Sequence, residues 1–190
     1  NKGPFEYWPT GYGFEYFYGF LAGEASQYEP QLVRNTTPVS HHEITRKGYH
    51  LTEDIAEDAI KWLREQHAFA PDKPFLMYWA PGAAHGPHHV AKEWAQKYKG
   101  KFDQGWDKLR EEVFARQKAM GWIPSDTELT PRDPTMAAWA DIPEAERAFQ
   151  TRLMELYAGF CEHTDAQVGK LIDYLDQAGQ RDNTIIFYIW

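Results

Sequence analysis

The spacing of apolar residues predicts two long helices. Over residues 52–68, apolar side chains recur every three or four positions, as on a helix with one buried face, and Thr52 is placed to cap its start. A longer run with the same spacing covers residues 144–178, and Gly179 follows it where helices commonly end. We therefore expect amphipathic helices over both ranges.

Two short segments are apolar at every position, a pattern typical of strands buried on both faces. They are residues 75–80 (FLMYWA) and 185–190 (IIFYIW), and each follows one of the predicted helices. Helix followed by strand, twice over, indicates an α/β fold. We expect one central sheet, mixed but largely parallel, flanked by the two helices.

The remaining segments have weaker patterns. Residues 1–50 are rich in glycine, proline and aromatics without a sustained period, which predicts a packed meander. Residues 91–122 have a helical pattern with charged surfaces, whereas the prolines within residues 123–143 preclude one continuous helix.

Composition excludes several classes of protein. The 190 residues hold 28 acidic and 20 basic side chains, giving a net charge of -8 with no basic block, which argues against a nucleic-acid surface. No apolar run is long enough to span a membrane. The single cysteine, Cys161, excludes an internal disulfide. Because the chain starts without methionine and ends within an apolar run, we expect it to be an internal portion of a longer protein.

Three histidines follow the first predicted strand: His85, His88 and His89. In open α/β sheets, ligands bind beyond the carboxyl ends of strands, which is where these residues fall. The residues alone leave three interpretations open: a transition-metal site, an imidazole that acts as donor, acid or base toward an anionic substrate, or solvated loop histidines. We expect His89, which is further along the loop, to be more exposed to solvent than His85.

Other candidate residues lie within the second predicted helix. Cys161 is expected to be a buried structural thiol rather than a nucleophile. His163 and Asp165 are two positions apart, so they do not face each other on a helix, and we expect structural roles for both.

Four segments, in order, resemble the middle of the bacterial type I arylsulfatases of the alkaline-phosphatase-like superfamily. They are GYGFEYFYGFLAGE, PFLMYWAPGAAHGPHH, KYKGKFDQGWDKLREEVFARQKAMGWIP and MELYAGFCEHTDAQVGKLIDYLDQAGQRDNTIIF. The resemblance implies that residues 1–190 are the central part of a single catalytic domain, whose N- and C-terminal parts would lie outside this chain. It also implies hydrolysis of aryl sulfate esters by a formylglycine beside a bound calcium ion.

The family's nucleophile motif, Cys-x-Pro-x-Arg, does not occur in this chain, because the residues after Cys161 are Glu-His-Thr-Asp. The resemblance places the calcium ligands outside this segment, so we expect no metal ligand within it and no activity from this chain alone. It matches His85 to the family histidine that contacts the sulfate near the leaving oxygen, and makes His88 a candidate wall of the substrate pocket. Ala84 replaces the proline usual before that histidine.

Two alternatives to a sulfatase stay open: a phosphonate or phosphate ester hydrolase of the same superfamily, and a non-catalytic protein that keeps the fold. The expected partners are a small sulfate ester and the remainder of the sulfatase domain, with no nucleic acid and no membrane. The compartment, periplasm or cytoplasm of a bacterium, is not identified by the sequence.

Overall fold

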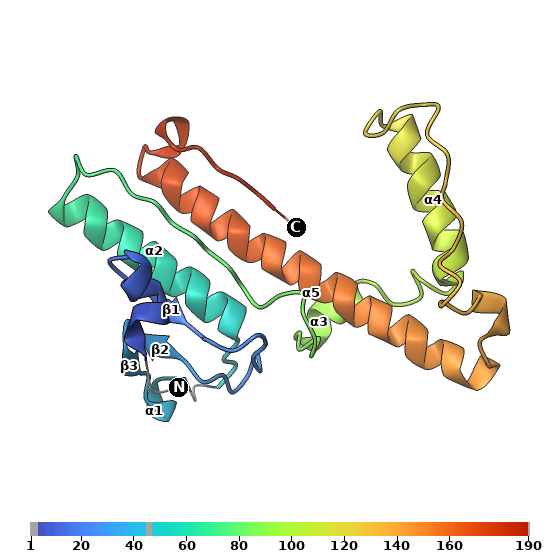
Figure 1. Cartoon of the computed structure of the whole chain (residues 1–190), viewed down its shortest axis with the longest axis horizontal. Coiled ribbons are helices and arrows are strands. Elements are labelled where there is room, and N and C mark those ends of the chain that lie inside the picture. The colour runs from blue at the N-terminus through green and yellow to red at the C-terminus, as the bar shows by residue number, and fades with distance from the viewer. Residues whose placement is uncertain (1–3, 45–46, 190) are drawn as a thin grey trace. The chain divides into compact units, whose positions relative to one another are not determined.

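The computed structural model describes residues 4–44 and 47–189, which fall into two compact units (Figure 1). The first unit consists of Asn1–His89 with Phe160–Trp190, and the second of Val90–Gly159. The long helix α5, Glu144–Gln177, contributes residues to both. No helix of the described residues is long and apolar enough to cross a membrane.

The first unit begins with short elements. They are the 3-10 helices η1 (Phe5–Tyr7) and η2 (Pro9–Tyr12), the strands β1 (Tyr18–Gly19), β2 (Val33–Arg34) and β3 (Thr37–Pro38), and the helix α1 (His41–Ile44). The strands pair antiparallel in the order β1-β2-β3, with Tyr18 opposite Arg34. Within the described ranges this is the only sheet, so the parallel sheet predicted from the sequence is not formed by these residues.

Helix α2, Leu51–Phe69, matches the prediction for residues 52–68, but its cap is different. The N-cap residue is His50, whose Nδ1 accepts the backbone N–H of Thr52 at 3.3 Å. Thr52 instead lies in the first turn, fully buried, and its hydroxyl donates to Oε1 of Gln27 at 2.9 Å. Glu53 and Asp54 also lie in this turn, where negative charge suits the helix dipole.

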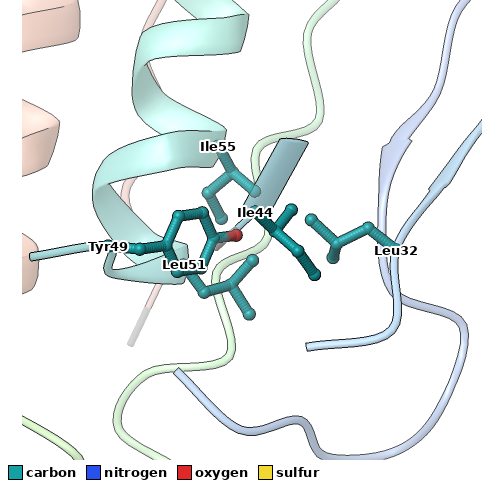
Figure 2. Close-up of a cluster of buried hydrophobic side chains, with 5 residues drawn as sticks. All are labelled: Leu32, Ile44, Tyr49, Leu51 and Ile55. Carbon is teal, nitrogen blue, oxygen red and sulfur yellow. The ribbon is translucent and has the colours of Figure 1, made fainter. Parts of the chain in front are cut away.

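A hydrophobic cluster joins the small sheet, α1 and the start of α2 (Figure 2). Its buried members are Leu32, Ile44, Tyr49, Leu51 and Ile55. Each fully buried aliphatic side chain of this kind contributes about 1.5–3 kcal/mol relative to an exposed one. These contacts hold the meander of the first 50 residues against α2.

Polar contacts reinforce the attachment of the sheet to α2. The hydroxyl of Tyr16 donates to Asp58 at 2.7 Å, and that of Tyr18 donates to Asp54 at 2.5 Å. The Arg34 guanidinium lies 4.7 Å from the centre of the Tyr18 ring. Burial, with the hydrogen bond to Asp58, raises the pKa of Tyr16 to about 12.

The two segments predicted as buried strands are extended but unpaired. In residues 75–80 exposure alternates: Phe75 and Met77 pack on a cluster of Leu63, Tyr174 and Leu175, while Leu76 and Tyr78 are 80% and 79% exposed. The prediction of buried strands is therefore not confirmed by the described residues. A strand is stabilised by hydrogen bonds to neighbouring strands, and no described residue supplies them.

The second of these segments has the same character. It follows Gly179, which ends α5 with a φ of 67°, and the 3-10 helix η4 (Arg181–Asn183). Ile185, Phe187 and Ile189 are more than four-fifths exposed, and the residues between them less so. Trp190, the last residue of the predicted strand, lies outside the described residues.

In the second unit the helical pattern of residues 91–122 becomes two helices, α3 (Lys92–Gln96) and α4 (Gly105–Ala119), followed by the 3-10 helix η3 (Trp139–Asp141). Gly105 has a φ of 77°, and a Cβ atom there would lie 2.2 Å from the Trp139 ring. Gly159 of α5 approaches the backbone of Ala95 in α3, where an added Cβ would lie 2.9 Å away. Both glycines permit contacts that any side chain would prevent.

Candidate functional site

The three loop histidines have different surroundings. His85 is exposed, with 65% of its side chain accessible, and His88 is half-buried. The ring of His89 stacks on Tyr28 at 5.0 Å between centroids, and its Nδ1 accepts the backbone N–H of Gln27 at 3.4 Å. The expectation that His89 is more exposed than His85 is therefore wrong, because His89 packs against the segment around Gln27.

The protonation pattern of His85 follows from its contacts. Its Nδ1 lies 2.8 Å from the carbonyl oxygen of Gly86 and 3.4 Å from Oε2 of Glu24. Because a carbonyl oxygen only accepts, Nδ1 must carry a proton. The other ring nitrogen, Nε2, has no hydrogen-bond partner among residues 4–44 and 47–189, so it is the nitrogen available to a ligand.

The histidine loop is backed by the segment that follows β1. A Cβ atom added at Gly82 would lie 3.2 Å from Nε2 of Gln27 and 3.3 Å from the Phe20 ring. Gln27 is 1% exposed, and its carbonyl accepts the N–H of Leu51 at 2.7 Å. The position of the loop is thus fixed by buried contacts, although His85 itself reaches solvent.

Beneath the loop lies a buried polar cluster. His50 is 4% exposed, and its Nε2 donates to the carbonyl of His89 at 2.9 Å while Nδ1 caps α2. Its ring stands edge-to-face with that of His163, 4.4 Å away between centroids. His163 in turn contacts Oε1 of Glu53 at 2.9 Å. These contacts tie α5, the start of α2 and the histidine loop together.

The hydrogen bonds require neutral His50. One ring nitrogen donates and the other accepts, which only an uncharged imidazole can do. The pKa of His50 is lowered, mainly by burial and further by repulsion from His163. The hydrogen bond to the His89 carbonyl acts in the opposite direction and raises the pKa, but it does not outweigh burial.

The candidate residues in α5 are His163, Asp165 and Cys161. His163 is buried and faces Glu53, whereas Asp165 is exposed, so the two do not form a pair with each other. Cys161 is half-buried, whereas a buried thiol was expected.

No metal centre is formed by the described part of the chain. Residues 4–44 and 47–189 contain no group of three histidine, cysteine or acidic side chains that could hold an ion. Nδ1 of His89 accepts a backbone N–H, and its ring stacks on Tyr28. The metal-site interpretation of the histidine cluster therefore has no support in this structure.

Each unit carries a surface cleft, and the histidine loop lines neither. The cleft of the first unit, about 370 Å³, is lined by Tyr16, Arg34, Glu43, Asp58, Lys61, Trp62 and Glu65. That of the second unit, about 640 Å³, is lined by Gln96, Lys99, Gly100, Asp103, Trp139, Arg147, Ala148, Thr151, Arg152 and Glu155. His85 stands on an open surface rather than in a closed pocket.

Sequence reasoning missed several residues that organise the site. Glu24 and Gln27 lie about 60 residues before the histidines they contact, and no short-range pattern links them. His50 could have been noticed as the residue before Leu51, but Thr52 is the more common type of capping residue.

The class of protein is established by the family comparison. The sequence model of the sulfatase family matches residues 1–189, so the chain belongs to the sulfatase family. Membership implies the alkaline-phosphatase-like α/β fold, of which the helices described above are part.

Two individual sulfatases are similar in sequence to this chain. The chain is 26% identical to an arylsulfatase of Klebsiella aerogenes over 189 residues, which cover 95% of this chain and 40% of the relative. It is 31% identical to an uncharacterized sulfatase of Schizosaccharomyces pombe over 161 residues, 84% of this chain and 28% of the relative. The chain therefore spans less than half the length of either relative.

Proposed function

We propose that the protein containing this chain is an arylsulfatase, which hydrolyses aryl sulfate esters, and that His85 is one of its catalytic and substrate-binding residues. The observation that carries the proposal is the position of His85: it follows an extended apolar segment, on a loop fixed from behind, with Nε2 open to a ligand. Family membership and the likeness to an arylsulfatase support the same class of substrate.

The chemistry of His85 follows from the proton on Nδ1. In the doubly protonated ring, Nε2–H can donate to a sulfate oxygen or to the leaving oxygen. When the bond between sulfur and that oxygen breaks, the oxygen takes the Nε2 proton and the electron pair of the N–H bond stays on the ring. The ring is then neutral, with its remaining proton still directed at the Gly86 carbonyl. General-acid help of this kind accelerates reactions by about 10²–10⁴-fold.

His88 is proposed as a second substrate-binding residue, forming a wall of the pocket. It lies three positions beyond His85 and is half-buried. It would shape the substrate pocket and exclude water from it, without a part in proton transfer.

The formylglycine nucleophile and the calcium ion are proposed to belong to parts of the protein outside this chain. The residues described here do not fit a calcium site, since no three of them form a set of ligands. When bound, calcium would supply positive charge beside the sulfate oxygens. The chain alone is accordingly expected to be inactive.

We also propose that residues 1–190 are the central part of a single catalytic domain, in which residues 75–80 and 185–190 become strands of a largely parallel sheet. The alternating exposure of 75–80 and 185–189 leaves one apolar face of each uncovered, including Leu76, Tyr78 and Phe187. The remainder of the domain would cover these side chains and pair with both edges of each segment.

The test is an activity measurement on the full-length protein. Purified enzyme is assayed with nitrophenyl sulfate, nitrophenyl phosphate and a nitrophenyl phosphonate ester under the same conditions with added calcium. The proposal expects kcat/KM to be highest for the sulfate. Higher kcat/KM for a phosphorus ester would identify a phosphate or phosphonate hydrolase instead, and no turnover of any would indicate a non-catalytic protein.

A further inference from the structure

Glu24 places a carboxylate beside the candidate catalytic histidine. Its Oε2 atom lies 3.4 Å from Nδ1 of His85, the same nitrogen that lies 2.8 Å from the Gly86 carbonyl oxygen. Both acceptors thus converge on one ring nitrogen, and neither approaches Nε2. Two acceptors at Nδ1 favour the form of the ring that carries its proton there.

The position of Glu24 is set by its neighbours in sequence. Phe20 on one side and Gln27 on the other both lie against Gly82 of the histidine loop. Gln27 also donates its backbone N–H to His89, so the segment contacts the loop before and after His85. The Glu24 carboxylate is therefore brought to His85 by a segment that is itself held against the loop.

We propose that Glu24 is a positioning residue for His85, an inference that rests on the proposed function. Together with the Gly86 carbonyl, the carboxylate keeps the proton of the neutral ring on Nδ1 and turns Nε2 toward the substrate. Without it, only the Gly86 carbonyl favours the proton on Nδ1, so a larger share of the neutral ring takes the other form, with the proton on Nε2 and no lone pair there.

The consequence concerns both directions of proton transfer. With Nδ1 protonated, the lone pair of Nε2 in the neutral ring takes up a proton from solvent, and Nε2–H of the charged ring gives that proton to a leaving oxygen. One N–H bond breaks and one O–H bond forms, and the positive charge lost by the ring cancels the negative charge of the departing oxygen. Glu24 keeps its negative charge throughout and exchanges no proton.

A purely structural role is the competing explanation. The two side chains are each 65% exposed, and ion pairs as exposed as this contribute little to stability. Unfolding measurements therefore do not distinguish the two explanations. The two explanations are distinguished by which nitrogen of the His85 ring carries the proton, and by the coupling between Glu24 and His85 in their effects on kcat.

The first experiment is nitrogen NMR of the full-length protein labelled with ¹⁵N-histidine, at a pH where the His85 ring is neutral. The His85→Ala variant assigns the signals. The wild type is expected to show the proton on Nδ1, Glu24→Ala to shift the ring toward the Nε2–H form, and Glu24→Gln to restore part of the original pattern through its amide oxygen. Glu29→Ala is the matched control, since Glu29 is exposed on the same segment and has no ion pair within the described part of the chain.

An Nε2–H ring in the wild type, or a ring unchanged by Glu24→Ala, overturns the inference. This readout needs no turnover, so it stands even if the protein fails to hydrolyse sulfate esters and the proposed function is wrong.

The second experiment is a double-mutant cycle on nitrophenyl sulfate. Glu24→Ala is expected to lower kcat about tenfold with little change in KM, as for other partners that orient a working histidine. In the His85→Ala background the same substitution should have no further effect. An equal loss of kcat in both backgrounds would show that Glu24 does not act through His85.

Discussion

Replacing His50 with alanine is expected to lower the free energy of unfolding of the first unit by about 2–4 kcal/mol. The ring caps α2 by accepting the Thr52 N–H and donates to the partly buried carbonyl of His89. Loss of a capping acceptor costs about 0.5–2 kcal/mol. A buried carbonyl left without its donor costs about 1–3 kcal/mol.

The destabilisation should depend on pH, with a sign fixed by the lowered pKa of His50. Burial, the largest cause, makes the folded state take up the proton less readily than the unfolded chain, where histidine has a pKa of about 6.5. The contribution of neutral His50 is therefore fully present above about pH 6.5 and is lost as pH falls through this value toward the folded-state pKa. Each unit of difference in pKa corresponds to about 1.4 kcal/mol.

The assay is urea unfolding followed by tryptophan fluorescence, at about pH 8 and about pH 5.5. The difference in free energy of unfolding between wild type and His50→Ala should narrow at the lower pH, because only the wild type has a buried imidazole whose protonation favours the unfolded state. His50→Asn keeps a capping oxygen and should recover about 1 kcal/mol. His42→Ala, an exposed histidine of α1, serves as the control and should leave stability unchanged. An equal difference in free energy of unfolding at both pH values would refute the conclusion that the His50 ring is buried and neutral.

Three further predictions concern the packing and the charges. Gly105→Ala should destabilise the second unit by more than about 1 kcal/mol, measured by thermal unfolding, because a Cβ atom would overlap the Trp139 ring and φ is positive; a melting temperature unchanged by the substitution contradicts this. Tyr16 should ionise near pH 12 in an ultraviolet titration. Its contribution to stability is therefore present below about pH 10 and is lost as pH rises toward 12. A titration curve like that of an ordinary phenol would contradict its burial against Asp58. Glu155→Ala should lower the free energy of unfolding by about 1–3 kcal/mol, since its buried carboxylate accepts the Gly100 N–H and pairs with an arginine. Glu146→Ala, at an exposed position of the same helix, provides the comparison in the same unfolding assay.

The helices were predictable because their signals are local. The period of apolar residues identifies α2 and α5 to within a residue or two at each end, and Gly179 marks the end of α5. Pairing of strands is not local. The residues 75–80 carry the composition of a buried strand, yet the partners that such a strand needs are not among the described residues, and the two-residue strands of the small sheet are too short to show any period.

The candidate site was predictable in part for the same reason. The position of His85 after an apolar segment, and the resemblance of its loop to a known family, both depend on consecutive residues. The contact of His89 with Gln27 joins residues 62 positions apart, and the contact of His85 with Glu24 spans a similar separation. Contacts of this range become visible only once the chain is folded.

The central claim, that His85 acts in sulfate ester hydrolysis, is tested most directly by the kinetics of His85→Ala in the full-length protein. The account predicts a fall in kcat/KM of at least about a hundredfold, with His42→Ala close to wild type. Across phenyl sulfates of increasing phenol pKa, the loss should grow if His85 protonates the leaving oxygen and stay constant if it mainly holds the sulfate. A His85→Ala variant within about threefold of wild type on every ester, far short of the usual effect of removing an acid or a sulfate donor, would contradict the account and exclude His85 from the active site.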